Sequence, residues 1–164
     1  MKLLVRCSVF ALFLPAILLP SHAQSPGKVM PKLEAVAETR LLMEGLAHAN
    51  FRGLERKLTN QPTEAQEWTF ARGQALLIAE TANLLMLRPP RNKGEALWFD
   101  RSMQLRTQAI QLAVRLSKKD YEGSRAGLTQ LAVTCNRCHQ TFRVPIEIAP
   151  FQQQEEKVPM RKVE

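Results

Sequence analysis

The sequence predicts an all-α protein folded as an antiparallel up-down four-helix bundle. Glycine and proline are concentrated between long segments, and no stretch alternates polar and apolar residues with the period of a strand. Four segments repeat apolar residues at spacings of three and four, which is the pattern of an amphipathic helix. Because the connections between them are short, each helix is expected to run antiparallel to the one before it.

The amino-terminal residues 1–23 have the composition of a secretory signal peptide. A positively charged start precedes an apolar stretch, residues 8–19, and residues 21–23 (Ser-His-Ala) offer a small-residue cleavage site. The apolar stretch is too short to span a bilayer. We therefore expect a soluble protein exported to the periplasm, in which residues 24–30 are a flexible leader.

Turn and capping residues set the bounds of the four predicted helices. Pro31 is acceptable in the first turn of a helix, whereas Pro89 and Pro90 in succession cannot continue one. Thr63 with Gln66 has the spacing of a capping box at a helix start. The helices are predicted at residues 31–58, 63–88, 95–116 and 121–143.

The first predicted helix carries an apolar sector about 80° wide, when each residue turns by about 100°. Its members are Leu33, Val36, Met43, Ala47, Phe51, Leu54 and Leu58. In this phase Leu42 points about 100° away from the sector and Leu41 lies off the opposite flank. The corresponding faces of the second and third helices are predicted as Leu77, Ile78, Leu84 and Leu85, and as Trp98, Leu105, Leu112 and Leu116.

The last predicted helix, which Asp120 begins as an N-cap, brings its cysteines onto an apolar stripe. Leu128, Leu131, Cys135 and Cys138 follow one another at spacings of three and four. Both thiols are therefore predicted to face the core of the bundle from one side of the helix.

Cys135, Cys138 and His139 form a CxxCH motif. In c-type attachment, two thiols add across the vinyl groups of haem and the histidine that follows binds the iron. Residues three apart on a helix face one way, so both thiols reach the same porphyrin edge. Export also fits, because this attachment takes place outside the cytoplasm. The motif predicts a single covalent haem c whose iron is held by His139.

Three other chemistries use a CxxC pair. A zinc site needs about four nitrogen or sulfur ligands, whereas residues 24–164 hold two cysteines and two histidines, and His48 lies about 80° off its helix's apolar sector. A thioredoxin-like redox pair follows a strand and opens a helix, whereas Cys135 and Cys138 lie deep in a predicted helix. A structural disulfide, or two buried thiols, is the third alternative.

The motif is part of a longer pattern. After His139 the chain continues to Phe142 and Arg143, which gives CH-x-x-Phe-Arg, and the stretches LLMEGLAHANFRGL and YEGSRAGLTQLAVTCNRCH lie in the first and last helices. On these residues the chain resembles the class II cytochromes c, meaning cytochrome c′ and its low-spin, methionine-ligated relatives. The resemblance implies a four-helix haem domain at residues 31–143, followed by an extended or disordered tail at 144–164.

The same resemblance assigns sides to the haem. It places the haem between the first and last helices, with His139 as the proximal iron ligand and Phe142 and Arg143 on the proximal side. In this family the sixth iron position faces the first helix, which offers a methionine in low-spin carriers and often a non-ligating apolar residue in cytochrome c′. Met43 is the predicted distal ligand because it lies in the apolar sector.

Other occupants of the distal position stay open. Leu42, His48 and the more distant Met30 are alternatives, and Met43 could also be a core residue. This choice bears on function, because the axial ligand and access to the iron select electron transfer or gas binding. We expect an electron carrier, with a high-spin haem protein that binds NO or CO as the alternative.

The sequence does not favour an enzyme. We find no Ser-His-Asp arrangement, placeable carboxylate pair or phosphate loop. A haem peroxidase needs a distal acid–base histidine, and the only candidate, His48, is poorly phased. Peroxidase activity is therefore not expected.

The charge balance indicates the kind of partner. Loss of Lys2 and Arg6 with the signal peptide lowers the net charge from +8 to +6. A basic exported protein without a basic-aromatic cluster is expected to meet acidic redox partner proteins and no nucleic acid. Members of the family are often dimers through their first two helices, so the resemblance makes a homodimer one option.

Overall fold

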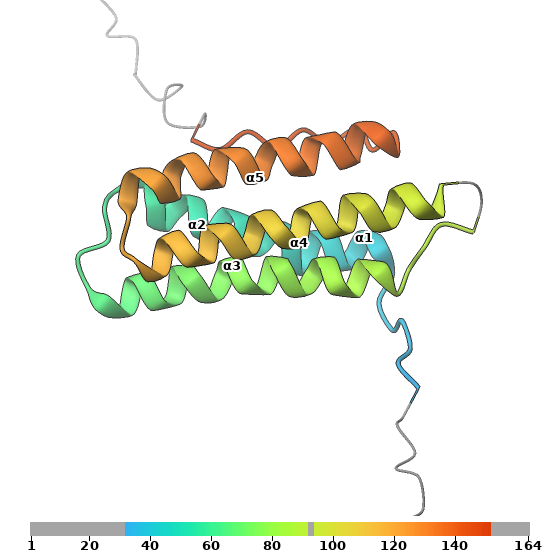
Figure 1. The fold of residues 1–164 in the computed structure, drawn as a ribbon, viewed down its shortest axis with the longest axis horizontal. Helices are drawn as coiled ribbons and strands as arrows, with labels where there is room; N and C mark the ends of the chain where they lie inside the picture. Colours follow the sequence, from blue (N-terminus) through green and yellow to red (C-terminus); the bar gives the residue numbers. More distant parts are fainter. Residues whose placement is uncertain (1–31, 92–93, 152–164) are drawn as a thin grey trace, which may run out of the picture. The chain divides into compact units, whose positions relative to one another are not determined.

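A computed structural model of the chain describes residues 32–91 and 94–151, and every regular element in those two ranges is helical. The first helical segment is continuous from Thr39 to Thr59 and consists of α1 (Thr39–Leu42), the π-helical η1 (Met43–His48) and α2 (Ala49–Thr59). It is followed by α3 (Ala65–Met86), α4 (Glu95–Ser117) and α5 (Tyr121–Thr141) (Figure 1). The predicted all-α class is confirmed for this part of the chain, whereas the predicted signal peptide (1–23) and leader (24–30) lie outside it.

The first helix begins later than its predicted start at residue 31. Helical structure starts at Thr39, and the two apolar residues assigned to its early turns are exposed, Leu33 by 76% and Val36 by 95%. Helices in proteins gain most of their stability from packing an apolar face. Without a packing partner, the turns before Thr39 do not form.

The cap of α3 differs from the predicted pair of Thr63 and Gln66. Glu64 is the N-cap and forms a capping box with Glu67, one residue further along. The Glu67 carboxylate also accepts a hydrogen bond from the Thr63 backbone N–H at 3.1 Å and receives the ammonium of Lys57 at 3.1 Å. Glu67, a charged side chain with several donors within reach, therefore fills the capping role predicted for Gln66. The cap of α5 is as predicted, because Asp120 accepts a hydrogen bond from the Gly123 N–H.

The helices pack in a closed order: α2 contacts α3 and α5, while α4 contacts α3 and α5. The leucines predicted for the core of α4 and α5 are buried, with Leu112, Leu116, Leu128 and Leu131 at most 1% exposed, whereas Trp98, Cys135 and Cys138 are only partly buried. The face of α3 differs, since Leu77 is 45% exposed. Small residues take over the interior of α3, and the buried set is Trp68, Ala71, Ala75, Ile78, Ala79, Ala82 and Leu85. This alanine-rich face lets neighbouring helices approach α3 closely.

The carboxyl end of α2 is tied to the start of α5. The Tyr121 hydroxyl donates to the carbonyls of Leu58 and Thr59 at 3.3 and 3.2 Å, and the Arg125 guanidinium bonds the same two carbonyls. These carbonyls belong to the last turn of a helix and have no partner inside it. α2 and α5 are thereby held side by side at one end, which fixes the two walls of the site described below.

Among the described residues, none of the helices is both long and apolar enough to cross a membrane.

Candidate functional site

A cavity of about 730 Å³ lies among the first helical segment, α3, α4 and α5. This volume is within the range of about 300–1,000 Å³ typical of small-molecule and cofactor sites. Its walls are largely apolar, with Ala47, Phe51, Ile78, Leu85, Trp98, Leu105, Ile146 and Ile148 among the lining residues. The cavity is therefore able to take a large apolar ligand.

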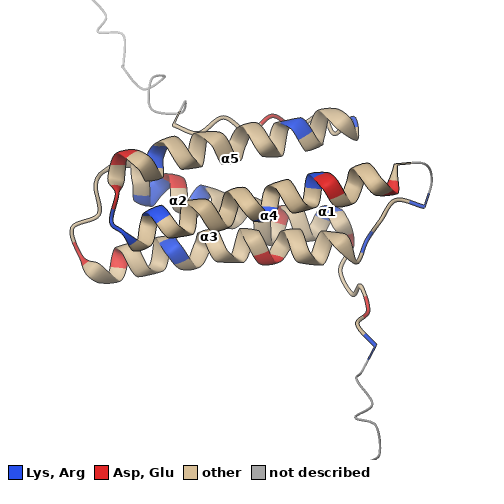
Figure 2. Cartoon of the chain, in the orientation of Figure 1, with Lys and Arg blue, Asp and Glu red and all other residues tan. Residues whose placement is uncertain are grey.

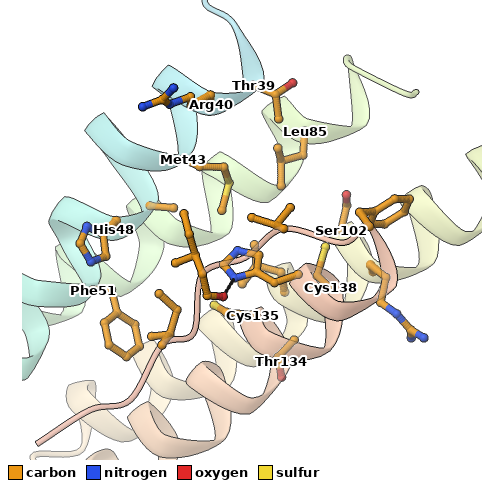
Figure 3. A pocket seen from close by; sticks show the side chains of 18 of the residues that line it. Thr39, Arg40, Met43, His48, Phe51, Leu85, Ser102, Thr134, Cys135 and Cys138 are labelled. Carbon is orange, nitrogen blue, oxygen red and sulfur yellow. Dashed lines mark hydrogen bonds between the residues drawn. The ribbon is translucent and has the colours of Figure 1, made fainter. Parts of the chain in front are cut away.

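The CxxCH motif opens onto this cavity. Cys135, Cys138 and His139 all line it, and Figure 3 shows both cysteine side chains reaching inward from α5. Because α5 is a regular α-helix here, the spacing of three puts both thiols on one face. Met43 lines the opposite wall and comes from the first helical segment.

The two cysteines are free thiols. Burial raises the pKa of Cys135 to about 12, and the neighbouring Cys138 adds to the rise. Burial also raises the pKa of Cys138, although the positive charge of Arg101 opposes this. Thiolates are the reactive form in redox exchange and in zinc binding. These surroundings favour the neutral thiol, unlike the electropositive setting of a redox-active pair.

The imidazole of His139 has a defined orientation. Its Nδ1 lies 2.8 Å from the backbone carbonyl oxygen of Ile146. A carbonyl only accepts, so Nδ1 carries the proton and donates it. In a neutral ring this leaves the Nε2 lone pair free to bind a metal. A hydrogen bond of this kind commonly orients a metal-binding histidine and raises its basicity.

The first helical segment, called the distal wall below, departs from a regular α-helix where it meets the cavity. Met43–His48 is a π-helix, and the Asn50 side-chain amide donates to the Leu46 carbonyl at 2.7 Å. A π turn contains one extra residue, which rotates the side chains before it by about 100° relative to an α-helix. Accordingly Leu42, predicted to point away from the core, is buried at 7% exposure. Met43 is only partly buried and lines the cavity.

The alternative distal residues are placed differently. Leu42 packs in the core and does not line the cavity, and Leu41 is 57% exposed. His48 does line the cavity, but it is exposed and its Nε2 accepts a hydrogen bond from Arg52 at 3.3 Å. Met30 lies outside the described residues. Within the described ranges, no three His, Cys, Asp or Glu side chains gather as metal ligands would.

Phe142 and Arg143, expected on the proximal side, have different surroundings. Phe142 lines the cavity and packs edge-on against Trp98, with ring centroids 5.1 Å apart. The indole of Trp98 is itself fixed by a 2.8 Å hydrogen bond to the Leu85 carbonyl. Arg143 is not among the lining residues; it takes a left-handed conformation, with φ of 56°, at the turn that ends α5.

The sequence did not point to the segment after this turn as part of the site. Residues 144–151, called the C-terminal strap below, contain no helix or strand and run back along α5. Val144, Pro145, Ile146 and Ile148 line the cavity. The sequence holds a short hint: Val144, Ile146 and Ile148 occupy every second position, which suits an extended segment but covers too few residues to predict a strand.

Arg101 was also missed. It lines the cavity from α4, close to Cys138, and its guanidinium is held by Asp100 at 3.1 Å and by Thr141 at 3.3 Å. Arg40 also lines the cavity, together with Glu44, to which it pairs at 2.8 Å, so charged groups edge a mostly apolar site. The signal was a cation between Trp98 and Leu105 on the predicted apolar face of α4.

The residues around the cavity fit a covalently held haem. The two free thiols, three residues apart, could form the thioethers, and His139 Nε2 could bind the iron, within walls that are mostly apolar. A zinc site would need further nitrogen or sulfur ligands beside these three.

Comparisons of the chain with protein-family models, with curated proteins and with solved structures gave no match.

Proposed function

We propose that this protein is an exported monohaem c-type cytochrome that carries electrons in the periplasm. One observation carries the proposal: Cys135, Cys138, His139 and Met43 line a single apolar cavity from two opposite helices. Thioether bonds from the two cysteines would hold haem c, and His139 Nε2 would bind its iron from the proximal side. The class II cytochrome c resemblance of the motif and its flanks supports the same assignment.

We also propose how the helices are arranged in space. The four helical segments would form an antiparallel up-down four-helix bundle, as in cytochrome c′. The connections of residues 60–64, 87–94 and 118–120 are short, and consecutive segments pack on one another. Short connections of this kind favour antiparallel neighbours.

Each group at the cavity has a proposed role. The bound haem would supply a one-electron change at iron, which no amino-acid side chain here provides. Apolar residues such as Phe51 and Leu105 would exclude water and set a low dielectric around the iron. Arg101 and Arg40 would offset the charge of the propionates, and Phe142 would pack against Trp98 at the cavity wall.

The distal side separates the carrier from its runner-up. Met43 extends toward the cavity from η1, across from the motif, so its thioether would be the sixth iron ligand of a low-spin carrier. If Met43 did not bind, the apolar wall of Ala47, Phe51 and Ile78 would suit a small apolar gas such as NO or CO. That wall is the observation that favours the gas-binding alternative.

The surface bears on the partner. Lys, Arg, Asp and Glu are interspersed along the helices rather than collected in separate regions (Figure 2), while the chain without Lys2 and Arg6 has a net charge of +6. We propose acidic redox proteins as partners, with association rates that fall as salt screens the attraction. A homodimer, which the family resemblance allows, would bury part of the first two helical segments.

Absorption spectra of the purified ferric and ferrous protein test the proposal. A methionine–histidine carrier is expected to show a weak far-red band in the ferric state and sharp α and β bands in the ferrous state. A broad high-spin spectrum that changes sharply when NO is added would replace the carrier with the gas-binding alternative. A protein without any haem absorption would contradict both.

A further inference from the structure

The C-terminal strap is fastened to the helices at several points. It begins at the left-handed turn of Arg143, where the Val144 N–H donates to the His139 carbonyl at 2.8 Å. Its far end is held by α2, because the Phe151 N–H donates to the Glu55 carboxylate at 2.6 Å. The Arg125 guanidinium lies 4.0 Å from the centre of the Phe151 ring. The strap therefore spans from α5 to α2, the two helices already tied together by Arg125.

Asn136 supplies the central fastening. Its side-chain Nδ2 donates to the Ile148 carbonyl and its Oδ1 accepts from the Ile148 N–H, each at 2.8 Å. One amide thus pairs with both backbone groups of a single residue, as a neighbouring strand would. This pair of hydrogen bonds fixes the register of the strap along α5. Two residues earlier, the same register presents the Ile146 carbonyl to His139 Nδ1 at 2.8 Å.

We propose that Asn136 is a positioning residue for the iron ligand, acting through the strap on His139. The inference rests on the proposed haem function but concerns residues that the motif does not name. By holding Ile148, Asn136 keeps the Ile146 carbonyl where it takes the Nδ1 proton, so that Nε2 faces the cavity as the free nitrogen. Asn136 is the first x residue of CxxCH, directly after Cys135. The motif therefore contains both the proposed iron ligand, His139, and the residue that holds the strap whose carbonyl orients it.

This arrangement has a physical consequence for the iron. Donation of the Nδ1 proton to a carbonyl raises the electron density on Nε2 and makes it a stronger donor. A stronger axial donor favours the ferric state and lowers the reduction potential. Loss of the Asn136 clamp should therefore loosen the strap, weaken the His139–Ile146 hydrogen bond and raise the potential.

The test compares Asn136→Ala with Asn136→Asp and with Gln130→Ala in the purified holoprotein. Gln130 is an exposed residue of the same helix, so its variant controls for an α5 substitution. Three quantities are measured for each protein: amide hydrogen exchange at Ile148, the NMR signal of the His139 Nδ1 proton, and the midpoint potential.

Asn136→Ala is expected to accelerate exchange at Ile148 by about tenfold or more, because both hydrogen bonds are lost. It should also deplete the Nδ1 proton signal and raise the potential. Asn136→Asp retains the acceptor but not the donor and should fall between Asn136→Ala and the parent protein. Gln130→Ala should change none of the three readouts.

Two results would overturn the inference. Faster exchange at Ile148 with an unchanged Nδ1 proton would mean that Asn136 holds the strap without positioning His139. Unchanged exchange would mean that Asn136 does not hold the strap at all. If the parent protein carried no haem, the proposed function would be refuted instead. Exchange at Ile148 and the Nδ1 proton signal, compared between the haem-free parent and its Asn136 variants, would still decide whether Asn136 positions His139.

Discussion

The two walls of the cavity, α5 and the first helical segment, are built differently. On α5 the candidate groups lie within five residues of a regular α-helix, Cys135 to His139, and the strap behind them fixes the orientation of His139. On the distal wall the candidate residue lies at the start of a π-helix, in a segment whose first turns did not form as predicted. The spacing of the CxxCH motif sets the geometry of the α5 wall. On the first helical segment, the geometry depends on how the π-helix rotates the side chains around it.

Because of this difference, the two walls place their candidate groups by different means. Cys135, Cys138 and His139 need only an α-helix to face one cavity. Met43 reaches the same cavity from a π-helix that also turns Leu42 into the core. π-helical turns are uncommon and often occur at functional sites, which suits a residue placed to meet a ligand.

Replacement of both cysteines of α5 by alanine is expected to have the largest effect. Without Cys135 and Cys138 no thioether can form, so covalent haem should be lost completely. Haem staining after denaturing electrophoresis measures this, and the single variants should each retain one bond. Full staining of the double variant would show that the α5 wall does not attach haem.

Met43→Ala tests the distal wall. The weak far-red ferric band should disappear and the spectrum should become high-spin, because the alanine side chain offers no ligand atom. Met103→Ala is the matched control, since Met103 is 46% exposed on α4 and does not line the cavity. An unchanged spectrum for Met43→Ala would remove Met43 as the ligand and leave His48 or an open iron.

Leu54→Ala and Leu128→Ala compare the frameworks behind the two walls. Both leucines are fully buried, and each truncation should lower the free energy of unfolding by about 2–5 kcal/mol. Urea unfolding of the two variants gives the comparison. A negligible cost for Leu54→Ala alone would mean that the first helical segment is not packed as firmly as α5.

The smallest effect is expected at two glycines of the first helical segment. A methyl group on Gly45 would meet nothing, so Gly45→Ala should stabilise the protein by about 0.5–1 kcal/mol. A methyl group on Gly53 would collide with the buried amide of Gln74, so Gly53→Ala should destabilise it. Thermal unfolding distinguishes the two signs, and stabilisation by both would contradict the close approach of α2 to α3.

The sequence predicted what depends on residues close together in the chain. Helix existence, the Asp120 cap and the shared face of Cys135 and Cys138 all follow from local spacing and agree with the structure. The start at Thr39 and the exposure of Leu77 depend on tertiary packing, which periodicity alone does not contain. The burial of Leu42 depends on a π turn, for which the sequence carries no evident signal. The role of the strap required the contacts of Asn136 and His139 to be seen together.

The most direct test of the central claim is the intact mass of the denatured protein, purified from a host that exports it and attaches haem. The expected mass is that of residues 24–164 plus one covalently attached haem. The mass of the bare polypeptide, or a mass lower by only the two hydrogens of a Cys135–Cys138 disulfide, would contradict it.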